Sequence, residues 1–242
     1  MGLGLGSSLS SPAYSKTAYA VTRSVDLDGT NQHIIITNSV ADDIKNIGSV
    51  SIWFKADAAF QNDTLFNLHT DTSNDNKIAL LHISTSNEIR LNCRGGSTNT
   101  IINADHTINT SNWVHVVATW DRTANKMAIY INGDSIETGT NAITNFATTA
   151  NKIYLGKPGN ADNAFFDGHL SSLSLFDAVL SPGNVTTLYN SGKPGDVSAS
   201  GISSLVAWLP LDETSGNFID RTSTGADGVP TNSPTQGVAD VP

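Results

Sequence analysis

The segment from Trp113 to Gly133 constrains the fold more than any other part of the sequence. Its apolar residues recur at every second position on both sides of a polar loop: Val114, Val116, Ala118 and Trp120 precede the loop, and Met127, Ile129 and Ile131 follow it. Such alternation is typical of a β-strand with one buried face. The loop 121–125 supplies one turn and Asn132-Gly133 a second. The segment therefore predicts two antiparallel strands, followed by a third at 135–138.

The charge balance excludes several classes of partner. The chain has 242 residues and a net charge of -9, with 13 Lys and Arg against 22 Asp and Glu. This balance argues against binding to nucleic acid or to an anionic membrane surface. No stretch approaches the roughly 20 apolar residues that span a bilayer. The single cysteine, Cys93, excludes an intrachain disulfide, so the fold depends on its hydrophobic core.

Short strands separated by turn residues are expected along most of the chain. We predict further strands at 20–27, 34–37, 48–56, 64–68, 77–83, 88–93, 152–155, 165–176 and 205–211. Turn signals every 8 to 12 residues or so indicate an antiparallel sandwich or jelly roll. One short helix is expected, with Ser181 as its N-cap, Pro182 at its first position and Gly192 after its end.

The pattern divides the chain into three parts. Residues 1–20 form a Gly- and Ser-rich arm, whose repeating start comprises Gly2, Leu3, Gly4, Leu5 and Gly6. It lacks the basic and apolar regions of a secretory signal, and we expect it to dock on a neighbouring subunit. Residues 21–221 form one jelly-roll domain, to which the strand 205–211 returns. Residues 222–242 are expected to be a C-terminal tail.

Several segments resemble a known family in both content and order. They are SVDLDG from Ser24, GSVSIWFKA from Gly48, NWVHVVATWD from Asn112, IYLG from Ile153 and FFDGHLSSLSLFDAVLSPGNVTTLYNSG from Phe165. In this order they resemble the laminin-G-like, concanavalin A-like lectin/glucanase jelly-roll family, of the kind found in tailed-phage virion proteins. The resemblance covers most of residues 20–192. It implies an all-β fold of two antiparallel sheets with one short helix.

Catalysis is not expected, because the carboxylates of a glucanase are missing. Retaining glucanases need two carboxylates about 5 Å apart, which a strand of the form Glu-x-Asp-x-x-Glu would supply. The chain has three glutamates, Glu88, Glu137 and Glu213, each on a different segment. His115 and His169 have no nucleophile motif beside them. A glucanase therefore stays the least favoured alternative.

No cofactor is expected, with calcium as the one candidate. The resemblance implies a structural ion near the first and last strands, but Gln32 and Ser171 occupy the positions where the family has acidic residues. Asp220 and Asp227 lie in a second candidate loop, for which Asx turns are the alternative.

Tryptophans are the candidate platforms for a glycan. Trp53 and Trp113 fall opposite the aliphatic face of their strands and are the candidate glycan-binding residues. Trp120 and Trp208 are expected in the core.

Two classes of function remain. We expect a non-catalytic structural or adhesion protein on a large assembly, at the surface of a bacteriophage virion, as a capsid decoration or fibre protein. Its partners would be neighbouring subunits, the capsid shell, a homotrimer of this chain and surface glycans. The alternative is a free carbohydrate-binding, lectin-like module of a bacterial surface system.

Overall fold

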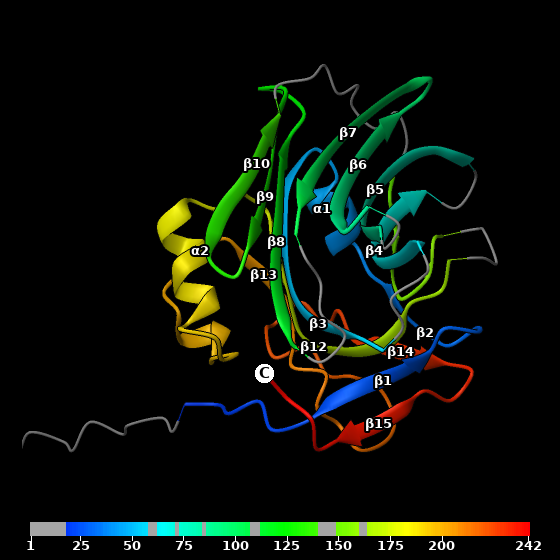
Figure 1. The fold of residues 1–242 in the computed structure, drawn as a ribbon, viewed down its shortest axis with the longest axis vertical. Coiled ribbons are helices and arrows are strands. Elements are labelled where there is room, and N and C mark those ends of the chain that lie inside the picture. Colours follow the sequence, from blue (N-terminus) through cyan, green and yellow to red (C-terminus); the bar gives the residue numbers. More distant parts are fainter. Residues whose placement is uncertain are drawn as a thin grey trace, which may run out of the picture.

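Two antiparallel sheets stacked face to face make up the fold (Figure 1). A computed structural model describes residues 18–57, 62–70, 73–83, 86–106, 112–139, 149–159 and 164–242. Within these residues, sheet A has eight strands and sheet B has seven. This confirms the predicted all-β sandwich.

Sheet A contains, in spatial order, β10 (Asp134–Gly139), β9 (Lys126–Ile131), β8 (Val114–Asp121), β3 (Ile47–Ala56), β12 (Asp167–Phe176), β1 (Ser24–Asp28) and β15 (Thr235–Val238), and β13 (Leu205–Leu209) pairs with β12. Sheet B contains β14 (Gly228–Thr231), β2 (His33–Thr37), β11 (Lys152–Leu155), β4 (Asn62–Thr70), β5 (Ser73–Ile83), β6 (Glu88–Gly95) and β7 (Thr98–Asp105).

The mid-chain meander has the predicted form. β8 pairs antiparallel with β9, with Val116 opposite Ile131, and β9 pairs with β10. Asn132 and Gly133 connect β9 to β10 with φ values of 52° and 88°. Positive φ at both central residues is what a tight type I′ hairpin turn requires, so the Asn-Gly pair specifies this connection.

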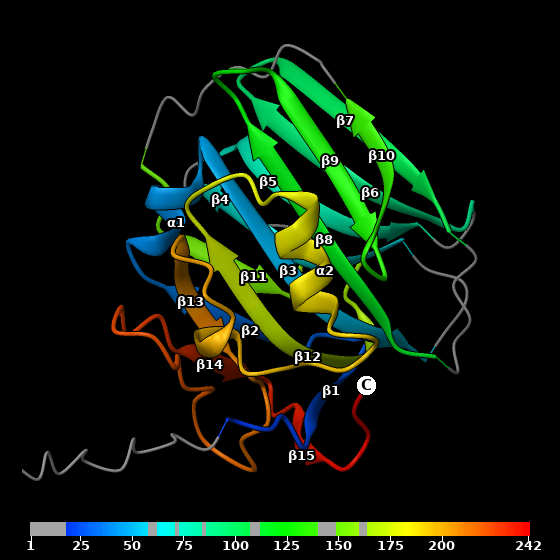
Figure 2. The same cartoon turned by 90° about the vertical axis from the view of Figure 1, so that its left-hand side faces the viewer.

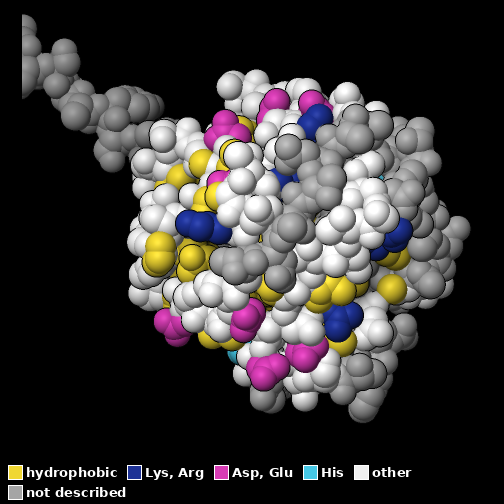
Figure 3. All heavy atoms as spheres, turned by 90° about the horizontal axis from the view of Figure 1, so that it is seen from above, with side chains coloured by type: hydrophobic (Ala, Val, Ile, Leu, Met, Phe, Trp, Pro, Cys, Tyr) yellow, Lys and Arg dark blue, Asp and Glu magenta, His cyan; other side chains and the backbone are white. Residues whose placement is uncertain are grey.

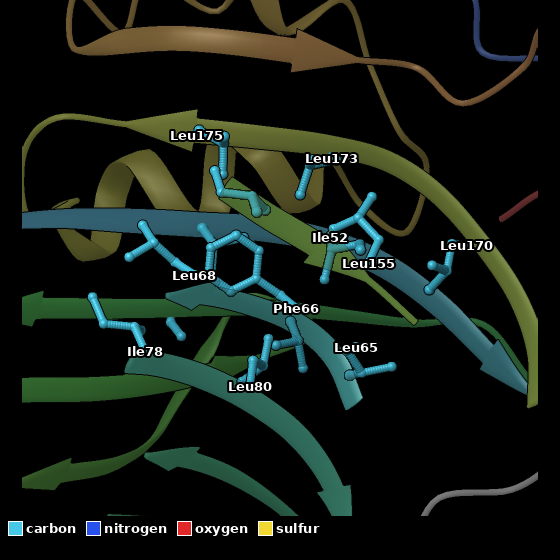
Figure 4. Packing of buried hydrophobic residues seen from close by; sticks show 14 of the residues in the cluster. Ile52, Leu65, Phe66, Leu68, Ile78, Leu80, Leu155, Leu170, Leu173 and Leu175 are labelled. Carbon is cyan, nitrogen blue, oxygen red and sulfur yellow. The ribbon is translucent and has the colours of Figure 1, made fainter. Parts of the chain in front are cut away.

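The core lies between the two sheets and is built from alternate residues of each strand. Phe66, Leu68, Ile78 and Leu80 from sheet B face Ile52, Leu170, Leu173 and Leu175 from sheet A (Figure 4). All eight are fully buried. Burial of each such side chain contributes roughly 1.5–3 kcal/mol, so this interior is the main source of stability.

A helix covers part of the outer face of sheet A (Figure 2). Helix α2 (Pro182–Tyr189) begins as predicted: the Ser181 side chain accepts a hydrogen bond from the Asn184 backbone N–H. Its Val185 and Leu188 join a second hydrophobic cluster that includes Phe176 and Trp208. Sheet A is therefore buried on both faces at this place.

Two shorter helical segments complete the described elements. They are α1 (Val40–Ile44) and the 3₁₀ helix Val197–Ala199. None of the helices in the described ranges has the length and hydrophobicity to cross a bilayer. On the described part of the face seen in Figure 3, basic side chains lie apart from one another, among polar, acidic and hydrophobic ones.

The C-terminal part of the chain differs from the expected tail. β14 pairs with β2 of sheet B, and β15 pairs with β1 of sheet A. Residues 222–242 therefore add one strand to each layer. The turn-rich sequence of this segment concealed both strands, because each has only four residues. Residues 1–17, which include the predicted arm residues, lie outside the described residues.

Candidate functional site

A pocket of about 670 Å³ opens between helix α2 and the turn that joins β9 to β10. We call it the helix pocket. Its lining consists of Asn132, Gly133, Asp134, Thr186, Thr187, Tyr189, Asn190 and Ser191. Pockets that hold small ligands have volumes of roughly 300–1,000 Å³. This lining combines amides, hydroxyls, one carboxylate and one aromatic ring.

The two walls of the pocket are held close together by a glycine. A Cβ on Gly133 would lie 3.0 Å from Cδ1 of Tyr189, which is closer than most side chains tolerate. Gly133 also has a φ of 88°, a conformation that glycine adopts without penalty. The Asn-Gly turn thus closes the hairpin and also lets α2 pack closely against it.

Helix α2 ends inside the pocket wall. Asn190 has a φ of 46° and its N–H donates to the Thr186 carbonyl, which forms the C-cap. The following Ser191 is also left-handed, with a φ of 57°. These two residues turn the chain away from the helix axis and place their polar side chains at the pocket.

Below the pocket lies a stack of three aromatic rings, which we call the aromatic stack. Trp53 stacks on His115 with ring centroids 4.8 Å apart, and Tyr189 lies 5.8 Å from Trp53 and 6.0 Å from His115. The interplanar angles are 29°, 17° and 21°. Offset stacking of this kind contributes about 0.5–1.5 kcal/mol per pair beyond burial, so it gives Tyr189 a rigid support.

His115 is neutral within this stack. Its Nε2 lies 2.8 Å from the Ser51 hydroxyl, and its ring is 1% exposed. Burial lowers the pKa of His115 to about 3, since the charged imidazolium would be without water. At neutral pH the imidazole therefore carries no charge, and its contribution is packing and one hydrogen bond.

The two tryptophans predicted as glycan platforms occupy different surroundings. Trp53 is 3% exposed, and its ring stacks against those of both His115 and Tyr189. Trp113 is half-buried, and its Nε1–H donates to Asp240 at 2.9 Å. Trp53 thus supports the pocket from beneath and does not line it. Trp120 and Trp208 are both buried, Trp120 in the interior and Trp208 under α2.

The carboxylates suggested for calcium are used within the protein. Asp220 accepts hydrogen bonds from the backbone N–H groups of Trp208, Thr222 and Ala226. The carboxylate of Asp227 accepts one from the Asp220 N–H at 2.8 Å. Burial alone would raise the pKa of Asp220, but the hydrogen bonds from the Trp208 and Thr222 N–H groups and from the Thr222 and Thr224 hydroxyls lower it. The loop matches the alternative interpretation, in which Asx turns close a surface connection.

A different set of potential metal ligands lies on the outer face of sheet A. Asp26, Asp57 and His169 place ligand atoms within 4.8 Å of one another. Nε2 of His169 is 3.7 Å from the Asp57 carboxylate. Asp57 is exposed, and acidic groups near a surface commonly gather in this way without a metal. This cluster could not be predicted from sequence patterns, because its members are far apart along the chain.

Comparison with known proteins agrees with this architecture. The family described as the concanavalin A-like lectin/glucanases superfamily matches residues 28–186. A pentraxin-related protein, PTX3, from Bos taurus is 28% identical over 142 residues, which are 55% of this chain and 36% of that protein. The chain therefore spans little more than a third of that relative's length.

Solved structures with low sequence identity share the fold. The heptameric SAP-like pentraxin from Limulus polyphemus has a TM-score of 0.64 at 17% identity, covering 91% of this chain and 97% of its own. A putative carbohydrate-binding protein from Bacteroides ovatus has a TM-score of 0.60 at 14% identity, covering 92% and 62%.

The carbohydrate-binding domain CBM40 of the Ruminococcus gnavus IT-sialidase, bound to α2,3 sialyllactose, has a TM-score of 0.57 at 14% identity, covering 71% of this chain and 100% of its own. The family match spans well over half of the sequence, and the two stacked sheets have the arrangement that this match implies. The chain belongs to the concanavalin A-like lectin/glucanases superfamily.

Proposed function

We propose that this protein is a non-catalytic, lectin-like module that binds carbohydrate in the helix pocket. The observation that carries the proposal is the pocket itself: about 670 Å³, with amide, hydroxyl and carboxylate groups around Tyr189. Sugars present many hydroxyls that donate and accept hydrogen bonds, and polar groups around one aromatic ring suit them.

The fold neighbours support this class of ligand. Two of them are described as carbohydrate-binding, and one of these holds sialyllactose. Their identity to this chain is too low to transfer a ligand or a site, so the proposal depends on the pocket.

The positions of the glutamates favour binding over hydrolysis. Glu88 is on β6 of sheet B, Glu137 is on β10 of sheet A, and Glu213 follows β13. Glu88 lies 3.8 Å from Arg90, and Glu213 lies 3.2 Å from Arg221. The three occupy separate elements and do not form the Glu-x-Asp-x-x-Glu strand that would supply the carboxylate pair of a retaining glucanase.

A glycan array with the full chain tests the proposal. We expect binding to a subset of glycans, and at least tenfold weaker binding by Asp134→Asn/Thr187→Val, which removes a charge and a hydroxyl from the pocket. Asp177→Asn/Thr138→Val makes the same changes at exposed positions outside the pocket and should bind like the unmodified chain. If the folded protein bound none of the glycans on the array, carbohydrate binding would be refuted. Equal binding by all three proteins would refute the pocket.

A second role, display on a large assembly, is favoured by the way the chain enters the domain. The Tyr19 hydroxyl donates to Asp212 at 2.8 Å, and its backbone N–H donates to Asp196 at 2.9 Å. The Arg221 guanidinium lies over the Tyr19 ring at 4.9 Å. Tyr19 is therefore anchored to the domain by its ring, its hydroxyl and its backbone, which is the attachment that a docking arm would need. A bacteriophage virion surface is the assembly that the family resemblance implies.

Removing residues 1–17 tests this second role and leaves Tyr19 in place. If the arm docks on a neighbour, the shortened chain should stay monomeric, or should fail to decorate particles, under conditions where the full chain assembles. Light scattering and sedimentation of both proteins would measure this. Identical assembly of the two would contradict the docking arm and leave carbohydrate binding untouched.

A further inference from the structure

The two threonines of the helix pocket have already used their hydroxyl hydrogens. The Thr186 hydroxyl donates to the Pro182 carbonyl at 3.1 Å. The Thr187 hydroxyl donates to the Gly183 carbonyl at 3.0 Å. A hydroxyl carries one hydrogen and two acceptor lone pairs. Because both threonines are exposed in the pocket lining, their oxygens meet a ligand as hydrogen-bond acceptors.

The two asparagines of the lining are used in opposite ways. The Nδ2 group of Asn190 donates to the Lys193 carbonyl at 3.2 Å, and its Oδ1 accepts no hydrogen bond from the described residues. The Oδ1 of Asn132 accepts from the His115 N–H at 3.0 Å, which leaves its amide hydrogens for a ligand. Asn190 thus adds one more acceptor, and Asn132 supplies donors.

Asp134 gives the pocket an unused negative charge. It is exposed, and its carboxylate makes no ion pair or hydrogen bond with any residue in the described ranges. The described lining residues include no Lys, Arg or His. The charged residues that follow the two pocket segments in the sequence are Glu137 and Lys193, one of each sign. With a net charge of -9, the rest of the chain also favours a cationic ligand.

We propose that the helix pocket selects a sugar with a free, protonated amine: a hexosamine unit whose ammonium binds Asp134 and whose hydroxyls donate to the threonine oxygens. An ammonium has three donors and no acceptor, which complements a lining rich in lone pairs. Hydrogen bonds between charged partners are roughly twice as strong as neutral ones, so Asp134 decides which sugar is preferred. A carboxylated sugar would bring a second negative charge beside Asp134. The inference rests on the carbohydrate binding proposed above and adds the chemical class of the sugar.

Calorimetric titration of the full chain with a glucosamine tetrasaccharide, at about pH 6 where such amines are protonated, tests this inference. N-acetylation removes the charge and keeps the sugar ring, so the N-acetylated tetrasaccharide is the matched ligand. We expect the free amine to bind at least tenfold more tightly than the N-acetylated form, with an affinity that falls as salt rises. Sialyllactose, which carries a carboxylate, should bind more weakly than either.

Three variants assign the preference to one carboxylate. Asp134→Asn should weaken binding of the glucosamine tetrasaccharide at least tenfold and change binding of the N-acetylated form less than twofold. Asp134→Glu keeps the charge and should keep the preference for the amine. Asp177→Asn removes one exposed carboxylate outside the pocket, so it changes the net charge equally and should bind both sugars like the unmodified chain. Thermal melting should show the same stability for all three, because both side chains are exposed.

The outcomes separate this inference from the proposed function. Pocket-dependent binding of neutral glycans on the array, together with equal affinity for the amine and its N-acetylated form, would leave carbohydrate binding in place and overturn the preference for an amine. Equal losses in Asp134→Asn and Asp177→Asn, or binding of tetralysine as tight as that of the tetrasaccharide, would assign the attraction to the acidic chain as a whole and would also overturn it. Binding of no sugar at all would refute the proposed function and this inference together.

Discussion

The outer faces of the two sheets are built by the same alternation of side chains and have opposite characters. On sheet A, helix α2 covers Trp53 and His115, and burial holds His115 neutral. On sheet B, the corresponding outward positions carry Lys77 and Arg94, neighbours of like charge. In both sheets, the alternation of side chains decides which residues point away from the core. The elements that pack on top of these outward residues decide whether the residues are buried, as on sheet A, or remain partly exposed, as Lys77 and Arg94 do on sheet B.

The largest effect is expected when one ring of the aromatic stack on sheet A is removed. Trp53→Ala should lower the free energy of unfolding by about 4 kcal/mol, because a fully packed ring is deleted and a cavity remains. Trp113→Ala, at a half-buried ring, should lower it by about half as much. Urea denaturation would measure both. Equal losses would mean that α2 does not seal the stack.

The second effect is an acid transition caused by His115. The pKa of His115 is about 3 in the folded chain against an ordinary value of 6.5. The stability that depends on the neutral ring is present above pH 6.5 and is lost as pH falls toward 3. Between pH 7 and pH 4 the loss is about 3 kcal/mol, since each unit below 6.5 removes roughly 1.4 kcal/mol.

Denaturation across this pH range would measure that loss, and His115→Gln should remove most of the pH dependence. An unchanged slope in His115→Gln would assign the acid transition to other groups.

On sheet B, the sharpest probe is Gly159, which lies against the His69 ring. Gly159 has a φ of 56°, and a Cβ there would lie 2.3 Å from Cδ2 of His69. Gly159→Ala should therefore cost about 2–3 kcal/mol, from the left-handed backbone and from the displacement of His69.

Gly96→Ala is the matched control, because Gly96 has a φ of 58° with open space around its Cβ position. It should cost about 1 kcal/mol. Equal costs in urea denaturation would show that His69 moves aside freely.

The smallest effect concerns the acidic cluster on sheet A. Burial raises the pKa of Asp26, and the charges of Asp57 and Asp28 add to this, while His169 opposes it. Because the ionised form is disfavoured in the folded chain, stability is lost as pH rises through the ordinary and then the raised pKa. Asp26→Asn should be more stable at pH 7 by less than about 1 kcal/mol, since the carboxylate is partly exposed. At pH 3 the two proteins should melt alike, and a less stable variant at pH 7 would reveal an unrecognised partner of Asp26.

Local patterns were sufficient to predict much of the fold. Strict alternation in 113–133 predicted β8 and β9, and Ser181-Pro182 predicted the start of α2. β7 was missed because Thr98–Asp105 is rich in Asn and Thr, with few apolar residues to reveal a period of two. β14 and β15 were missed because four-residue strands contain too few alternations to count.

The candidate sites could not be predicted in the same way. On sheet B, His69 lies opposite Lys152, 83 positions away in the sequence, and only the pairing of β4 with β11 brings them together. The helix pocket likewise combines a hairpin turn with a helix end from a distant segment. Trp53 was predicted as a platform from its position opposite the aliphatic face. The sequence did not show that α2 would cover that face.

The last two strands have a consequence for how this protein is made. β15 is an edge strand of sheet A and β14 is an edge strand of sheet B, so residues 228–238 supply one edge of each sheet. Neither layer can reach its final width on the ribosome until this stretch has left the exit tunnel. Both sheets should therefore be completed only after all the other strands of the domain have been synthesised. A chain that stalls before Gly228 would present two unpaired edges at once, a species prone to associate with its own kind.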